Sequence, residues 1–102
     1  MPEESKLQKR RNYIPVPRDY LKTRRNEMKY SMEGLSRELG ISAIYYYQIE
    51  GGQRGLRLPV NIILDLIYLL QFDAITFLTL ESQYQQRFAD QNNIESRNKT
   101  RW

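Results

Sequence analysis

The side chains of this chain that could take part in chemistry or binding are basic residues, amides, and serines that precede expected helices. The 102 residues contain no His and no Cys, which excludes a cysteine nucleophile, a Ser-His-Asp relay and a zinc site with His or Cys ligands. Disulfide bonds are excluded as well, so packing must supply the stability. The spacing of the acidic residues favours neither a carboxylate metal site nor a hydrolase. We therefore expect no metal, no cofactor and no enzymatic activity.

The positive charge is concentrated in the first third of the chain. The net charge is +4, from 16 Lys and Arg against 12 Asp and Glu. Residues 1–30 carry nine cations and four anions, whereas residues 31–102 carry seven cations and eight anions. Lys9, Arg10 and Arg11 are consecutive within the basic region. Such clustering suits a polyanionic partner, although a solvated basic tail is an equally simple interpretation.

No segment predicts a membrane span or a secretion signal. The most apolar stretch, residues 60–70, is shorter than the roughly 18 residues that a span needs, and it contains Asn61 and Asp65. The N-terminal residues are charged and reach no apolar core, unlike a signal peptide. Together with the absence of Cys, these features favour a cytoplasmic protein.

The elements that must position the candidate residues are helices. Asp19, Ser31, Ser42 and Asp73 each precede a helical pattern and are expected to cap it, and Pro59 suits the first turn of another helix. The expected helices cover residues 20 to about 29, 32–39, 43–50, 60–70 and 74 to about 88. The fold class is therefore predicted to be all-α, with five helices in a compact domain.

The chain divides into three parts. Residues 1–17 lack helical periodicity and contain Pro15 and Pro17, so we expect a flexible basic arm with an extended spacer. Residues 18–82 are the expected helical domain. Residues 83–102 are expected to extend the last helix and then to form a polar tail.

Residues 31–55, with the sequence SMEGLSRELGISAIYYYQIEGGQRG, combine a capped helix, a tight glycine turn and a second capped helix. This segment resembles the helix-turn-helix of the Xre family, the lambda-repressor-like DNA-binding domains. The matching positions are Ser31, Leu35-Ser36, Leu39-Gly40-Ile41-Ser42, Ile49-Glu50-Gly51-Gly52 and Arg54. The likeness continues through the Leu-rich helix at 60–70 to Phe72-Asp73. It implies a five-helix fold that binds double-stranded DNA.

In this family the second helix of the motif enters the major groove, where base edges can be distinguished. The resemblance places Tyr46 and Ile49 toward the core. It implies that Gln48 can pair with adenine, that Ile44 can meet a thymine methyl, and that Tyr47 can reach a phosphate. The full set expected to contact DNA is Met32, Ser42, Ala43, Ile44, Tyr47, Gln48, Gln53, Arg54 and Arg57, with Lys9, Arg10 and Arg11 of the arm.

Arg25 and Glu50 occupy positions that the family uses for a partly buried ion pair. The resemblance therefore assigns them to the architecture of the domain and not to contact with DNA. Lys22 and Arg24, in contrast, are expected to be free to face phosphate or solvent.

The helix at residues 60–70 is too apolar for one buried face. Val60, Ile63, Leu64, Ile67 and Leu70 would suffice for the core, which leaves Ile62, Tyr68 and Leu69 in surplus. The last helix could fold over these three residues within one chain. A homodimer is favoured instead, because the motif usually reads two half-sites one duplex turn apart.

The leading functional hypothesis is a sequence-specific, double-stranded DNA-binding transcriptional regulator that acts as a repressor. Proteins with this motif are common in phages, plasmids and other mobile elements. One alternative is an adaptor or antagonist that uses the face of Ala43, Ile44 and Tyr47 on a protein partner. Another is a DNA-binding accessory factor in replication or conjugative transfer.

Overall fold

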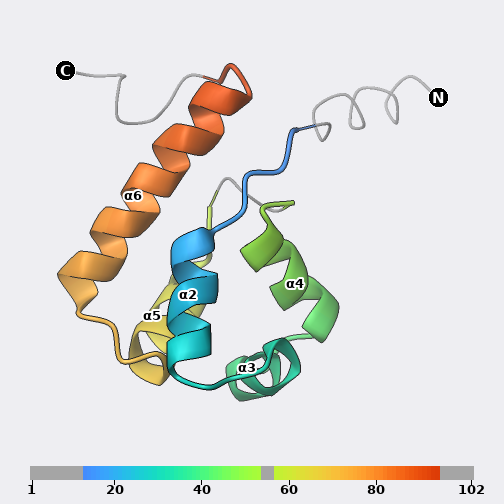
Figure 1. Ribbon diagram of the computed structural model, residues 1–102, viewed down its shortest axis with the longest axis vertical. Coiled ribbons are helices and arrows are strands. Elements are labelled where there is room, and N and C mark those ends of the chain that lie inside the picture. Colours follow the sequence, from blue (N-terminus) through green and yellow to red (C-terminus); the bar gives the residue numbers. More distant parts are fainter. Residues whose placement is uncertain (1–12, 54–56, 95–102) are drawn as a thin grey trace.

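The computed structural model describes residues 13–53 and 57–94, and within these ranges the chain forms five α-helices and no strand. The all-α fold class is thus confirmed. None of the described helices is long and apolar enough to cross a membrane. In Figure 1, α2 lies in the centre with α3 below it and α4 beside it, and α6 stands along the opposite side. The helices are α2 (Asp19–Glu27), α3 (Met32–Leu39), α4 (Ala43–Gly51), α5 (Val60–Leu69) and α6 (Ala74–Gln91).

Three of the four predicted caps are present. Ser31, Ser42 and Asp73 each accept a hydrogen bond from the main-chain N–H three residues later, at 2.9, 3.0 and 3.0 Å. Asp19 was expected to be a cap, which is wrong: it is the first helical residue of α2. Arg18 holds the cap position and makes no capping bond with its side chain, because that side chain bonds elsewhere in the core.

The core is built mainly from one apolar row on each helix, including Leu21, Leu35, Ile49 and Phe77. On α5 and the residues that flank it, this row is Leu58, Ile62, Leu66 and Leu70.

The predicted buried face of α5 was wrong in part. Leu70 is buried, and Ile63 and Ile67 pack partly buried against the core, as expected. Val60 and Leu64 are 69 and 61 % exposed, whereas Ile62, expected in the surplus set, is only 3 % exposed. Tyr68 is exposed and Leu69 is half-buried. Because apolar residues surround this helix on most sides, periodicity could not fix which side faces inward.

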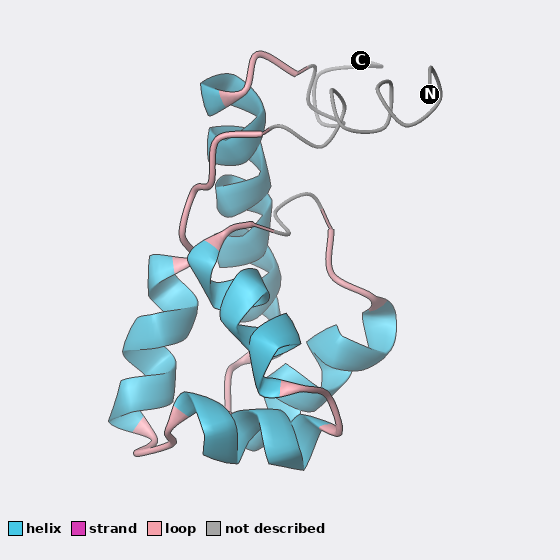
Figure 2. Ribbon diagram, turned by 90° about the vertical axis from the view of Figure 1, so that its right-hand side faces the viewer, coloured by secondary structure: helices cyan, strands magenta, loops and turns pink. Residues whose placement is uncertain are grey.

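The segment before α2 is packed against the body. Residues 13–18 run between α4 and α6 in Figure 1, and the same segment follows α6 in Figure 2. Ile14 exchanges hydrogen bonds with Asn92, and the ring of Tyr13 meets Phe88 edge-on at 5.5 Å between centroids. The flexible arm expected at residues 1–17 thus does not include residues 13–17; residues 1–12 lie outside the described ranges. The last helix, α6, extends past residue 82 to Gln91, in keeping with the helix extension expected there.

Candidate functional site

The turn between α3 and α4 fixes the angle between these two helices. Gly40 adopts a φ of +74°, a left-handed conformation that costs glycine little. The N–H of Ile41 then bonds the carbonyl of Ser36 at 3.1 Å, and Ser42 caps the next helix. Tyr46 and Ile49 of α4 are fully buried, as predicted. The helix α4 is therefore held on one side by the core and at its start by its cap.

The opposite side of α4 is exposed and largely apolar. Ile44 is 71 % and Tyr47 58 % exposed, and Ser42 and Ala43 are exposed beside them. Gln48 is half-buried and already has an interaction partner within the protein. Thus three of the four positions that the resemblance assigned to DNA on this helix are exposed, and so is the Ser42 cap before them.

An ion pair between Arg25 and Glu50 fixes the carboxyl-terminal half of α4 to α2. The guanidinium donates from Nε and Nη2 to the two carboxylate oxygens at 2.8 and 3.0 Å. The Tyr46 hydroxyl donates to the same carboxylate at 2.8 Å, and Arg25 also donates to the carbonyl of Tyr30. The hydrogen bonding that Arg25 donates to Glu50 raises the pKa of Arg25. The pair that the resemblance implied is present, and both partners are nearly buried.

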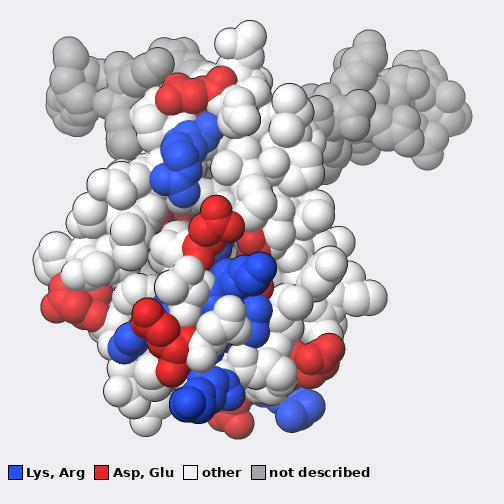
Figure 3. Space-filling view, in the orientation of Figure 1, with Lys and Arg blue, Asp and Glu red and all other residues white. Residues whose placement is uncertain are grey.

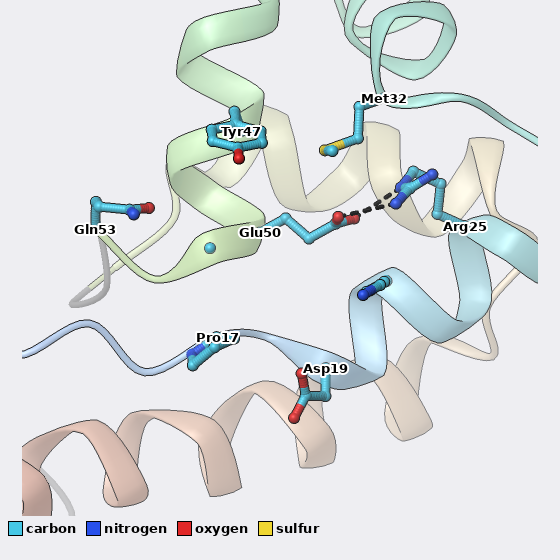
Figure 4. A pocket seen from close by; sticks show the side chains of 9 residues that line it. Pro17, Asp19, Arg25, Met32, Tyr47, Glu50 and Gln53 are labelled. Carbon is cyan, nitrogen blue, oxygen red and sulfur yellow. Dashed lines mark hydrogen bonds and ion pairs between the residues drawn. The ribbon is translucent and has the colours of Figure 1, made fainter.

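A groove of about 310 Å³ opens between α2, α4 and the segment before α2. Figure 4 shows Met32, Tyr47 and Gln53 on its α3 and α4 sides, with the Arg25–Glu50 pair joining α2 to α4 beside them. Lys22 lines the groove from α2. The structure thus brings together three of the residues expected to contact DNA, which come from different elements, beside the predicted ion pair.

The cations near this face differ in how freely they can meet a partner. Arg57 is exposed, whereas Arg54, Lys9, Arg10 and Arg11 lie outside the described residues. The expectation that Arg24 is free to face phosphate or solvent was wrong. Its guanidinium donates to the carbonyls of Leu70 and Gln71 at 2.8 and 3.1 Å and so joins α2 to the end of α5. On the face drawn in Figure 3, basic and acidic side chains are interspersed. The described surface on this side is therefore of mixed charge.

Sequence reasoning missed a second buried ion pair, between Arg18 and Glu81. Arg18 is 0 % exposed and donates to both oxygens of Glu81 at 2.9 and 2.8 Å. Burial disfavours the charge of Arg18, but the hydrogen bond to Glu81 and the charge interactions with Glu81 and the neighbouring tyrosines together outweigh it, so the pKa of Arg18 is raised. A signal was available: Glu81 falls on the same side of α6 as Phe77 and Tyr84, where a buried carboxylate requires a partner.

The outer faces of α5 and α6 carry further exposed apolar residues. Val60, Leu64 and Tyr68 follow one another at four-residue spacing on α5, and Tyr68 is 79 % exposed. Ile75 and Leu78 are exposed on α6. Of the three residues expected at a dimer contact, Tyr68 is open, Leu69 is partly open, and Ile62 belongs to the core.

Comparisons of the chain with protein-family models, with curated proteins and with solved structures found no match. The function must therefore be argued from the geometry of α3, α4 and their surroundings.

Proposed function

We propose that this protein is a sequence-specific regulator that binds double-stranded DNA and represses transcription, with no enzymatic role. The observation that carries the proposal is the way in which α4 is packed in the fold. One side is buried through Tyr46 and Ile49, Glu50 is bonded to α2, and the opposite side is exposed. A rigid helix with one open face is what insertion into the major groove requires.

The exposed residues suit that role chemically. Ala43 and Ile44 are apolar groups that can meet thymine methyls, and the Tyr47 hydroxyl can donate to a phosphate. The N-termini of α3 and α4 present main-chain N–H groups that favour nearby anions. Arg57 adds an exposed cation, and the basic residues of the N-terminal arm can add contacts to the DNA backbone. The Xre-like motif described above supports the same assignment.

The regulator is expected to act as a homodimer. The row of Val60, Leu64 and Tyr68 is exposed on α5, and such an apolar row favours packing against a second copy. Two copies would present two α4 helices to half-sites about 34 Å apart.

Selection of bound sequences from random DNA duplexes tests the proposal. The full chain should enrich a palindromic site, and affinity for that site should fall steeply with salt, since several phosphates are neutralised. Ile44→Ser should lower affinity about tenfold or more, because an apolar contact with a base is lost. The matched control is Ile75→Ser, since Ile44 and Ile75 are both 71 % exposed. If no sequence is enriched, the proposal is wrong.

A protein-binding role is the second candidate, because the exposed face of α4 is apolar at Ile44 and Tyr47. Binding to a protein through this face would depend only weakly on the salt concentration, whereas affinity for DNA would fall steeply as the salt concentration rises. The salt dependence therefore separates the two functions.

A further inference from the structure

Residues 13–18, here termed the strap, are bonded to two helices that are distant in sequence. On the α6 side, Asn92 donates to the carbonyl of Ile14 at 3.1 Å, and Tyr13 packs on Phe88. In Figure 4, Pro17 of the strap lies between the end of α4 and α6, which is the orange helix at the lower edge of the view. The strap thus lies between α4 and α6.

On the α4 side the strap satisfies the last carbonyls of the helix. The N–H of Arg18 donates to the carbonyl of Glu50 at 2.8 Å, and its Nη1 donates to the carbonyl of Ile49 at 2.8 Å. The main chains also touch, since a Cβ placed on Gly52 would come within 2.1 Å of the Val16 oxygen. Helix-terminal carbonyls have no partner within their own helix, so this contact fixes the end of α4.

Arg18 joins the two sides of the strap. The same guanidinium that bonds Ile49 also bonds Glu81 of α6 through two hydrogen bonds, and it stacks on the ring of Tyr84 at 4.2 Å. Glu81 accepts further hydrogen bonds from Tyr20 and from Gln85. Both charged groups are almost completely buried, so each depends mainly on its protein partners.

We propose that the strap and α6 form one latch, which opens and closes as a unit and holds the carboxyl end of α4. If the strap left alone, the Glu81 carboxylate would stay buried without its counter-charge. If α6 left alone, the Arg18 guanidinium would be stranded in the same way. Since an unpaired buried charge is costly, the release of one element weakens the hold on the other, and we expect the two to be released together. Glu81 is therefore a positioning residue for α4, although it lies on a different helix.

Amide hydrogen exchange on the full chain with Glu81→Gln tests the latch. The amides of Ile14 and Arg18 and those of α6 around Tyr84 should exchange faster together, by about tenfold or more, whereas the core amides of α3 and α5 stay within about twofold. Faster exchange in only one of the two elements would overturn the proposal, and so would uniform acceleration in all five helices. The control is Glu27→Gln, an exposed carboxylate that pairs with Arg24 at 3.1 Å; it should leave both elements unchanged.

A milder variant covers the case in which Glu81→Gln does not fold. Tyr13→Ala removes a partly exposed ring that touches α6 only through Phe88 in the contacts described. The latch predicts that exchange in α6 around Tyr84 rises in proportion to exchange at Ile14 and Arg18. If the strap amides exchange faster and those of α6 do not, the two elements are independent.

The role of the latch in DNA recognition rests on the proposed function. In a protein that binds a selected duplex, Glu81→Gln should weaken binding severalfold by loosening the end of α4. If the unaltered chain binds no duplex, the proposed function fails, and the exchange experiment still decides whether the latch exists.

Discussion

At the scale of single residues, two buried ion pairs share one design. In each, an arginine bonds both oxygens of a glutamate, a tyrosine hydroxyl donates to that glutamate, and the arginine also bonds a main-chain carbonyl. These added hydrogen bonds matter because a buried pair is tolerated only when its remaining donors and acceptors are satisfied. The pair at Arg25 follows from the motif, whereas the pair at Arg18 joins residues 63 positions apart.

Arg25→Ala should lower the free energy of unfolding by about 3–5 kcal/mol, because Glu50 would remain buried without its counter-charge. Urea unfolding measures the change. Arg37→Ala, at an exposed position on α3, should change stability by less than about 0.5 kcal/mol. Equal effects of the two substitutions would contradict the structural role of Arg25.

Tyr46 and Tyr84 are both fully buried, but their hydroxyls differ. The Tyr46 hydroxyl donates to Glu50, whereas the Tyr84 hydroxyl has no hydrogen-bond partner within the described chain. Tyr46→Phe should therefore cost about 1–2 kcal/mol, and Tyr84→Phe should be neutral or stabilise by up to about 1 kcal/mol. Thermal unfolding of the two variants measures the contrast, and a larger loss for Tyr84→Phe would refute it.

Stability should fall at alkaline pH. Burial, together with Glu81 or Glu50, raises the pKa of Tyr20 and of Tyr46 well above the ordinary value of 10.0. The unfolded chain then loses these protons before the folded chain does, so the stability is complete below pH 10 and is lost as the pH rises above it. Each tyrosine contributes a slope of about 1.4 kcal/mol per pH unit. Urea midpoints across this range measure the slope, and Tyr46→Phe should reduce it.

At the scale of elements, α4 depends on the chain segments at both of its ends. Its start is fixed by the Gly40 turn and the Ser42 cap, both of which are visible in the sequence. Its end is fixed by Arg25 and by the strap, which approaches so closely that position 52 has no room for a side chain. The contacts at the start of α4 are local in sequence, whereas those at its end form only when the whole chain has folded.

Two glycine substitutions separate these causes. Gly40 and Gly52 both have a left-handed φ, of +74° and +87°, but the space beside Gly40 is open. Gly40→Ala should thus cost only the backbone strain of about 1 kcal/mol. Gly52→Ala should cost at least about 2 kcal/mol more, since its Cβ would collide with the main chain of Val16. Similar midpoints in chemical denaturation would argue against the close approach of the strap.

At the scale of the whole molecule, apolar residues of α5 that are similar in type differ in position: some are buried in the core and others lie on the outer face. Ile62 is in the core, whereas Tyr68 lies on the outer face with Val60 and Leu64. The apolar residues of the inner side pack within the domain, and those of the outer side form the surface on which the proposed homodimer would assemble.

Tyr68→Ser and Ile62→Ala should therefore affect different properties. Ile62→Ala should reduce the free energy of unfolding by about 2–5 kcal/mol through loss of core packing. Tyr68→Ser should leave unfolding of the isolated chain within about 0.5 kcal/mol and weaken self-association. Sedimentation over a range of concentrations measures the association. A protein that remains monomeric at high concentration without any substitution would contradict the expected dimer.

The sequence by itself determined the features that depend on neighbouring residues. Helix positions, three of four caps and the glycine turn between α3 and α4 follow from propensities and spacing over a few residues. The buried and exposed sides of α4 and the Arg25–Glu50 pair were predicted because a motif resemblance supplied their context. Helix ends were less well determined; for example, α2 ends at Glu27, before Lys29, whose φ is +64°.

Only the tertiary structure decided which side of α5 is buried, where the strap lies and what Arg18 does. In α5, several faces are apolar enough to be buried, and the choice depends on the shape that the other helices leave. Arg18 and Glu81 meet only because the chain returns α6 to the strap, and no local pattern encodes that distance. Contacts between remote segments are selected by the free energy of the assembled core, which no short segment of the sequence contains.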